Sequence, residues 1–148
     1  MPSAIEQVLS ALRTPLETAG LTIETDRQAD DMLAGEEFPV VTLNWLGAEI
    51  QRIDSCGSYF WQAQVALDCW AKVATGQSVL AGCTAQVSTV AQVVQTEQET
   101  NSFGGLFHDC VPISVSDFAE MMGDRGCITV TLSVQYQTPK GDWNTILT

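Results

Sequence analysis

The clearest pattern in the chain is a strict alternation of apolar and polar residues near its C-terminal end. From Ile128 to Gln137, every even position is apolar and every odd position is polar. This period of two is typical of a strand with one buried face, and we place the strand at residues 127–137. Residues 38–46 and 58–73 alternate in the same way across the polar connection 47–57. We predict that these two runs form a long hairpin.

Two other segments carry apolar residues at helical spacing. Residues 4–19 form the first, where Ser3 can cap the start and Glu6 completes a capping box. Residues 77–98 form the second, with Thr75 or Ser78 as its cap. The predicted buried stripes are Ile5, Val8, Leu9, Leu12 and Leu16 in the first helix, and Leu80, Cys83, Val87, Val90 and Val94 in the second.

The remaining segments have weaker patterns. Residues 21–37 suggest an acidic loop with one short strand near 21–25, and residues 116–126 suggest a further loop. Residues 106–115 form a third strand that Pro112 interrupts, which places it at a sheet edge or a bulge. The order of elements predicts an α+β fold, with one four-stranded, mainly antiparallel sheet and two amphipathic helices packed on one face. The sheet is mixed if the crossover through the second helix creates a parallel pair.

The length and charge of the chain limit the classes of protein to which it can belong. Its 148 residues suit a single domain, 1–148, which ends in a short polar arm, 139–148. Six basic residues face 18 acidic ones, a net charge of -12 that repels nucleic-acid phosphate. This charge fits solubility, basic protein partners, or a pore along which DNA slides. We expect no signal peptide, no membrane span and production in a cytoplasm.

The sequence carries few groups suited to catalysis or metal binding. His108 is the single histidine, and the five cysteines contain no Cys-x-x-Cys pair. Adjacent carboxylates at 30–31 and 36–37 could bind a cation, but such pairs are usually just solvated. No nucleophile elbow or phosphate-binding glycine loop occurs. We therefore expect no enzyme activity, no cofactor and no metal site.

Two surfaces are candidates for contact with other proteins. The first is the polar side of the predicted sheet, which is almost uncharged although solvent-facing sheets usually carry charges. Its candidate interface residues are Thr42, Asn44, Gln62, Gln64, Thr129, Thr131, Ser133 and Gln135. The second is Trp143 in the terminal arm, because aromatic residues concentrate at the centres of interfaces. An ordinary solvated sheet face and a tryptophan docked on its own domain are the alternatives.

The region from Glu36 to Ala71 resembles the lambda-type minor tail proteins that terminate the tail tube of phages. The resemblance rests on the runs 38–41, 47–49, 54–55 and 61–63, and the order of predicted elements extends it over nearly the whole chain. It implies a hexameric ring that stops polymerisation of the major tail tube protein and presents a surface to the head–tail connector proteins. DNA would pass through the lumen without specific binding, and the protein would lie at the head-proximal end of the virion tail.

Two other functions stay open at this point. One is a different head–tail connector or tail-completion subunit of similar shape. The other is a small ligand-binding or enzymatic α+β domain, which predicts a pocket that holds His108 and several carboxylates.

Overall fold

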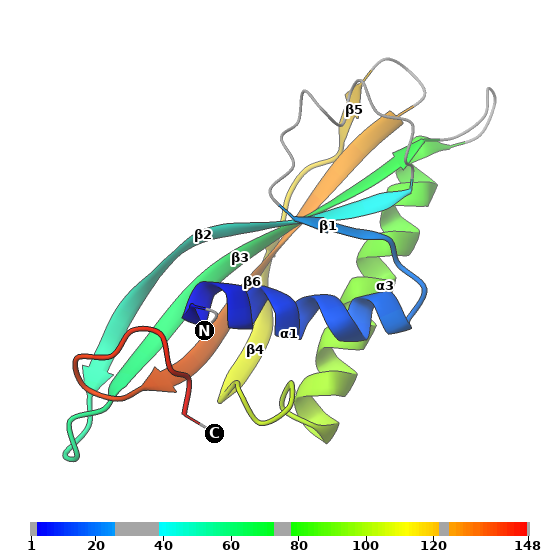
Figure 1. The fold of residues 1–148 in the computed structure, drawn as a ribbon. Coiled ribbons are helices and arrows are strands. Elements are labelled where there is room, and N and C mark those ends of the chain that lie inside the picture. Colours follow the sequence, from blue (N-terminus) through cyan, green and yellow to red (C-terminus); the bar gives the residue numbers. More distant parts are fainter. Residues whose placement is uncertain (1–2, 26–38, 73–77, 122–124, 148) are drawn as a thin grey trace.

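The computed structural model describes residues 3–25, 39–72, 78–121 and 125–147. It has an α+β fold in which two helices pack on a single five-stranded, mostly antiparallel open sheet (Figure 1). The strands lie in the order β1 (Ile23–Thr25), β2 (Val40–Ile53), β3 (Tyr59–Lys72), β6 (Arg125–Thr138) and β4 (Asp109–Val115). A short further strand, β5 (Ala119–Met121), pairs with β6 beyond the end of β4.

The predicted count of four strands is therefore wrong, because the short strand near residues 21–25 joins the sheet. β1 pairs in parallel with β2 through Ile23 and Val41, and every other strand pair is antiparallel. The sheet is mixed, but its parallel pair does not come from the crossover through the second helix. β3 and β4 are not neighbours, since β6 lies between them. β5 also lies inside the segment predicted as a loop.

The β2–β3 hairpin is longer than the sequence predicted. β2 continues to Ile53, so most of the expected polar connection 47–57 is strand. Two register shifts explain the difference, one between Trp45 and Gly47 and one between Ile50 and Arg52. A bulge moves the following residues to the opposite face, which breaks the alternation that identifies a strand.

Helix α1 (Ala4–Thr18) begins at the predicted capping box. The Glu6 N–H donates to Ser3 Oγ at 3.2 Å, and the Ser3 N–H donates to Glu6 Oε2 at 2.7 Å. The helix buries Ala4, Val8, Leu12 and Leu16, whereas Ile5 was predicted to be buried and is exposed. The helix continues past Pro15, close to its C-terminal end.

Helix α3 (Val79–Thr100) begins at the Ser78 cap, whose hydroxyl accepts from the Ala81 N–H at 3.2 Å. Two positions differ from the prediction. Leu80 is exposed, and Val79 lies in the core instead. Gln86, which is not part of the predicted stripe, is buried, and its Nε2 donates to the Trp70 carbonyl at 2.7 Å.

The core lies between the two helices and one face of the sheet. Residues from α1, from α3 and from strands β1, β2, β3, β4 and β6 form one continuous cluster. The even-numbered positions of β6 from Ile128 to Tyr136 are all buried, which confirms the apolar face of this strand. β4 lies at the edge of the sheet with a register shift at Pro112, so both expectations for that proline are confirmed.

Candidate functional site

The eight candidate interface residues of the sheet lie together on the face opposite the helices. Strand pairing aligns them in rungs: Thr42 with Thr129 through Asp68, Asn44 with Thr131 through Ala66, Gln64 with Ser133, and Gln62 with Gln135. We call this set the polar face: Thr42, Asn44, Gln62, Gln64, Thr129, Thr131, Ser133 and Gln135. Alternation along single strands was enough to predict it, because register preserves the two faces of a sheet.

The Asp68 carboxylate lies at the centre of the polar face and accepts three hydrogen bonds. Thr129 Oγ1 donates to it at 2.6 Å, Asn44 Nδ2 at 3.0 Å and Thr42 Oγ1 at 3.4 Å. These bonds tie β2, β3 and β6 together on their polar side. Thr42 is only 1% exposed, so its hydroxyl is removed from solvent. This half of the face therefore has a structural role.

The rest of the polar face is more open and carries more charge than the sequence suggested. Gln62 Nε2 donates to Ser133 Oγ at 2.8 Å, while Gln64 and Gln135 are exposed. The register adds Glu49, which follows the first bulge, and Arg52, which follows the second, to this side of the sheet. The Arg52 guanidinium lies 4.2 Å from the centre of the Phe60 ring. The exposed glutamines and this cation are the groups that a partner could reach.

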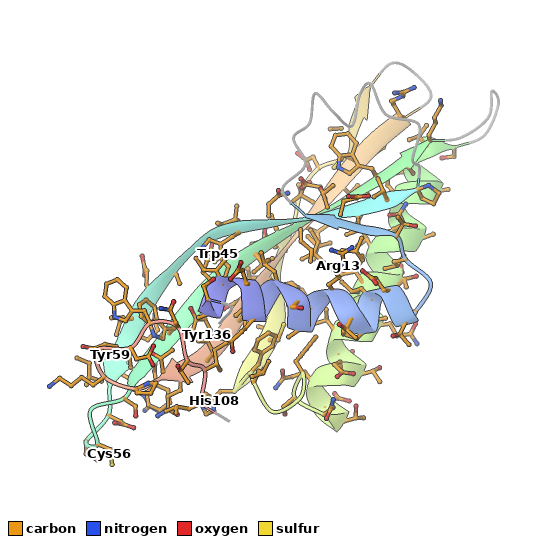
Figure 2. All side chains as sticks on the ribbon, viewed as in Figure 1. Arg13, Trp45, Cys56, Tyr59, His108 and Tyr136 are labelled. Atoms are coloured by element: carbon orange, nitrogen blue, oxygen red, sulfur yellow. The ribbon has the colours of Figure 1, made fainter. Side chains whose placement is uncertain are left out.

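A second surface gathers apolar and aromatic side chains at the far end of the hairpin, on the side where the helices pack. Trp61 pairs with Ile50, and Tyr59 pairs with Ile53. The Trp61 and Tyr59 rings meet edge to face, with centroids 6.4 Å apart. Figure 2 shows Tyr59 near this end, with Cys56 beyond it in the turn. We call Ile50, Ile53, Tyr59, Trp61 and Trp143 the aromatic end.

The terminal arm brings Trp143 to the aromatic end. Its ring packs edge-on against Trp61, with centroids 5.7 Å apart and an interplanar angle of 77°. On its other side, Trp61 lies nearly parallel to the buried Tyr136, with centroids 6.2 Å apart. The indole Nε1 of Trp61 donates to Thr138 Oγ1 at 2.9 Å. The aromatic end is therefore anchored in the core through Trp61, while Trp143 remains 63% exposed.

The arm itself is held by contacts on both sides of Trp143. Ile146 is buried in the core, and the Leu147 N–H donates to the Gln137 carbonyl at 2.8 Å. Gln7 Nε2 of α1 donates to the Asn144 carbonyl at 2.6 Å. The N–H of Asn144 donates to Asp142, which lowers the pKa of that carboxyl below its usual value. The Trp143 ring thus contacts its own domain through one edge and leaves most of its surface open to a partner.

A third surface, which the sequence did not reveal as apolar, lies on edge strand β4. Val111, Ile113 and Val115 are 40%, 48% and 58% exposed, and we call them the β4 strip. Because of the bulge at Pro112, Val111 lies opposite Ser133 on the polar side of the sheet, while Val115 lies opposite Val130 on the side of the helices. Pro112 was the available signal, since it predicted a sheet edge or a bulge. Exposed apolar side chains on a sheet edge are a common mark of a contact surface.

Among the described residues, no catalytic or metal-binding site surrounds His108. Its ring is exposed, its Nε2 lies 3.1 Å from Gln137 Oε1, and its centroid lies 5.6 Å from that of Phe60. Within residues 3–25, 39–72, 78–121 and 125–147, no group of three or more His, Cys, Asp or Glu side chains is placed to hold a metal. The carboxylate pairs at 30–31 and 36–37 lie outside the described residues.

Four of the five cysteines are buried, and their thiols are weakly reactive. Cys56 is exposed in the hairpin turn, while Cys69, Cys83, Cys110 and Cys127 are buried. Burial raises the pKa of the Cys69, Cys110 and Cys127 thiols to about 12. The reactive thiolate form is therefore suppressed at neutral pH.

Comparison with known proteins adds no family to this description. No protein-family model and no curated protein matches the chain. Among the helices that the structure describes, none has the length and apolar character needed to cross a membrane. The candidate site therefore rests on its geometry, which offers three surfaces for protein contact: the polar face, the aromatic end and the β4 strip.

Proposed function

We propose that the chain is a structural phage protein that terminates the tail tube. Copies of it form a ring, hexameric as the family resemblance implies, on the finished tube of major tail tube protein. The ring stops polymerisation and presents the attachment surface for the head–tail connector proteins. The protein is made in the host cytoplasm and ends up at the head-proximal end of the virion tail.

The observation that carries this proposal is the aromatic end. It exposes a tryptophan and holds a second one beneath it, at the end of a hairpin that projects beyond the helices (Figure 1). A soluble monomer gains nothing from keeping such a surface in water, whereas tryptophan and tyrosine dominate the energetics of protein interfaces. In a protein that assembles with others, such a surface can be buried in an interface.

The position of the aromatic end also supports the proposal. Residues 36–71 carry the resemblance to tail terminators, and their described part, 39–71, forms the β2–β3 hairpin. Four of the five residues of the aromatic end belong to this hairpin, the exception being Trp143. The resemblance and the exposed surface thus fall on the same element.

The charge of the chain fits a ring around DNA. A net charge of -12 gives a surface that repels phosphate, so a lumen lined by such subunits would let DNA pass without binding it. The exposed glutamines of the polar face can hydrogen-bond to a partner without adding to this charge. No enzymatic activity, cofactor or metal forms part of the proposal.

Electron microscopy of particles from a phage or prophage that lacks this gene tests the proposal. Overlong tails of variable length, beside filled heads that have no tail, are the expected result. Supplying the intact gene from a plasmid should restore a single tail length and head attachment. A plasmid with an early stop codon in the gene is the matched control.

Other results would lead to other functions. Tails of normal length would reject termination. If those tails were also unattached to heads, a head–tail connector or tail-completion role would replace it. Virions that are normal in every respect would place the function outside the particle, and a ligand-binding domain would then be the better hypothesis.

A further inference from the structure

A fourth surface lies where α1 packs against α3 (Figure 1). Two hollows of about 490 and 590 Å³ open between the helices, and Thr14, Pro15 and Glu97 line both of them. Because the hollows share these residues, they form one continuous groove, which we call the interhelical groove. Its lining residues on α1 run from Glu6 to Thr18, a length of roughly 18 Å at 1.5 Å per residue.

The interhelical groove contains apolar surface that the fold leaves partly uncovered. Ala11 of α1, Val93 of α3 and Leu106 after α3 pack against the core and also line the groove. Pro15 lies between them and is only half-buried. A groove of this length with apolar walls suits a short segment of a partner protein laid along it.

The charges that line the groove are negative. Of the lining residues that the structure describes, Glu6 and Glu97 are the charged ones. Arg13, the one basic residue of α1, is not among them, and its guanidinium pairs with Glu17. The hydrogen bond from the Ser3 N–H, with smaller contributions from the Ser3 hydroxyl and the N-terminal amine, lowers the pKa of Glu6. This carboxylate is therefore charged at neutral pH.

The C-terminal end of α3 also favours a cation. Its last turn contains Glu97 and Glu99 and no basic residue. A helix carries a partial negative charge at this end, so carboxylates there are unfavourable and cations are favourable. The Asn101 side chain donates from Nδ2 to Glu97 Oε1 at 2.9 Å, but a neutral amide does not cancel the charge.

Other polar groups of the groove act as hydrogen-bond acceptors. Pro15 has no N–H, so the Ala11 carbonyl lacks the bond that position 15 supplies in a regular helix. The Thr14 and Thr18 hydroxyls donate to the carbonyls of Ser10 and Thr14 at 3.2 and 2.9 Å, which leaves their oxygens to accept. Lysine and arginine side chains carry several donors, a positive charge and an apolar stem, and they fit this combination.

The chain itself has no segment that could supply such cations from a second copy. Its six basic residues are far apart in the sequence: Arg13, Arg27, Arg52, Lys72, Arg125 and Lys140. Among them, Arg13 is paired with Glu17 and Arg125 is buried. A second copy would also bring a net charge of -12 to a groove that is already acidic. The charges therefore favour a different protein as the occupant.

We infer that the interhelical groove binds a basic segment of a different protein. Lysine or arginine side chains of that segment contact Glu6 and Glu97, and its apolar side chains cover Ala11 and Val93. The apolar contacts supply affinity, and the carboxylates select for positive charge. This inference goes beyond the proposed function and does not depend on it.

Fluorescence anisotropy with a labelled synthetic peptide tests the inference on the full-length chain. The probe is a helix-forming peptide of leucine, alanine and lysine with about 12 residues, so that it matches the groove in length. A matched probe has glutamine in place of every lysine. Titrations in about 0.15 M salt limit attraction by distant charges. The lysine probe should bind the wild type, and the glutamine probe should bind at least about tenfold more weakly.

A bulky substitution locates the binding site. Thr14→Trp fills the groove where the two hollows meet and leaves the charge unchanged, so it should raise the dissociation constant at least about tenfold. Thr84→Trp is the matched control, because Thr84 is exposed on α3 and is not among the residues that line the groove. Its hydroxyl donates to the Leu80 carbonyl, as that of Thr14 donates to Ser10. This control should bind like the wild type.

Charge variants test the role of the two carboxylates. Glu6→Gln keeps the capping box, since glutamine can replace glutamate there, and Glu97→Gln keeps an oxygen for Asn101. Each variant should raise the dissociation constant about fivefold. Glu49→Gln removes the same charge from an exposed position on the polar face and should have no effect.

Three results would overturn the inference. The first is a wild type that does not bind the lysine probe. The second is equal binding by Thr14→Trp and the wild type, or equal losses in all three glutamine variants, because the probe would then bind the acidic surface in general. The third is self-association of the wild type, measured by sedimentation velocity, that Thr14→Trp abolishes and Thr84→Trp retains, because the occupant would then be a second copy.

Two further measurements keep these results interpretable. Circular dichroism checks the folding of each variant, and Thr18→Trp, at another exposed position of the groove, replaces Thr14→Trp if that variant does not fold. The phage that lacks the gene tests tail termination separately. Normal tails in that phage would reject termination and leave the groove inference intact, whereas overlong tails together with no binding of the lysine probe would do the reverse.

Discussion

Trp143 packs edge-on against Trp61, with the two ring centroids 5.7 Å apart. The contact joins the terminal arm to the turn end of the long hairpin, yet it leaves Trp143 63% exposed. Trp61 differs, because it hydrogen-bonds to Thr138 and lies along the buried Tyr136. The arm therefore adds an exposed aromatic surface to a well-anchored one, which is an arrangement suited to binding.

The first prediction concerns Trp143→Ala. The variant should weaken tail joining while it lowers the free energy of unfolding by only about 0.5–1.5 kcal/mol, the value of an aromatic pair. Complementation of the phage that lacks the gene gives the first quantity, and urea unfolding gives the second. Ile146→Ala is the control, because it empties a buried position of the same arm and should destabilise the fold by roughly 2–5 kcal/mol. Normal tail joining by Trp143→Ala would remove the arm from the interface.

The sequence was sufficient to predict the elements whose patterns run without interruption. The capping box at Ser3 and the apolar face of β6 depend on residues close together in the chain. The polar face could also be predicted, because alternation fixes which residues share a side once strands pair in register. Asp68 was not among the candidate residues, although it falls on the same side of β3 as Gln62 and Gln64 by alternation.

Other features depend on contacts between distant residues. Each of the bulges at Gly47 and Arg52 inverts the alternation of apolar and polar residues. The second half of β2 could therefore not be recognised as a strand from the sequence. Gln86 is buried because a carbonyl on β3 accepts its amide, and no local pattern carries that information. The aromatic end could not be found for the same reason: Trp143 meets Trp61 only after the arm folds back over the sheet.

The second prediction concerns Asp68, which joins three strands of the polar face. Asp68→Ala leaves the Thr42 and Thr129 hydroxyls and the Asn44 amide without their acceptor. Because Thr42 is buried, the free energy of unfolding should fall by about 1–3 kcal/mol. Gln64→Ala, on the same strand and the same face but exposed, should change it by less than about 0.5 kcal/mol. Equal effects of the two variants in urea unfolding would show that the Asp68 network does not stabilise the fold.

The third prediction is that the native chain has one rapidly reactive thiol among its five cysteines, since only Cys56 is exposed. A chromogenic disulfide reagent should titrate one equivalent quickly in the wild type. It should titrate none quickly in Cys56→Ser, and all five in urea-unfolded wild type. Rapid reaction of a second thiol in the folded protein would show that one of the buried sites opens readily.

The fourth prediction concerns alkaline pH. Burial raises the pKa of Cys110 to about 12, whereas an unfolded thiol titrates near about 8.5. Above that pH the unfolded chain loses a proton that the folded chain retains, so stability falls as the pH rises towards 12. Cys110→Ala removes this contribution and should reduce the loss of stability between pH 7.5 and pH 10 by about 2 kcal/mol. Urea unfolding at the two pH values measures it, and an unchanged loss would mean that Cys110 ionises in the folded state.

The fifth prediction concerns His108, whose exposed ring contacts Gln137 and Phe60. If the protein acts only by assembly, His108→Ala should restore tail length and head attachment as well as the wild type does. Its free energy of unfolding should fall by about 1 kcal/mol or less, the value of one hydrogen bond. Gln137→Ala is the control, because it removes the bond to His108, together with the bond that Gln137 Nε2 donates to Asp54 Oδ2 at 3.2 Å, and keeps the imidazole. Loss of function in a folded His108→Ala protein, with Gln137→Ala fully active, would require a chemical role for the imidazole and would bring back the enzymatic hypothesis.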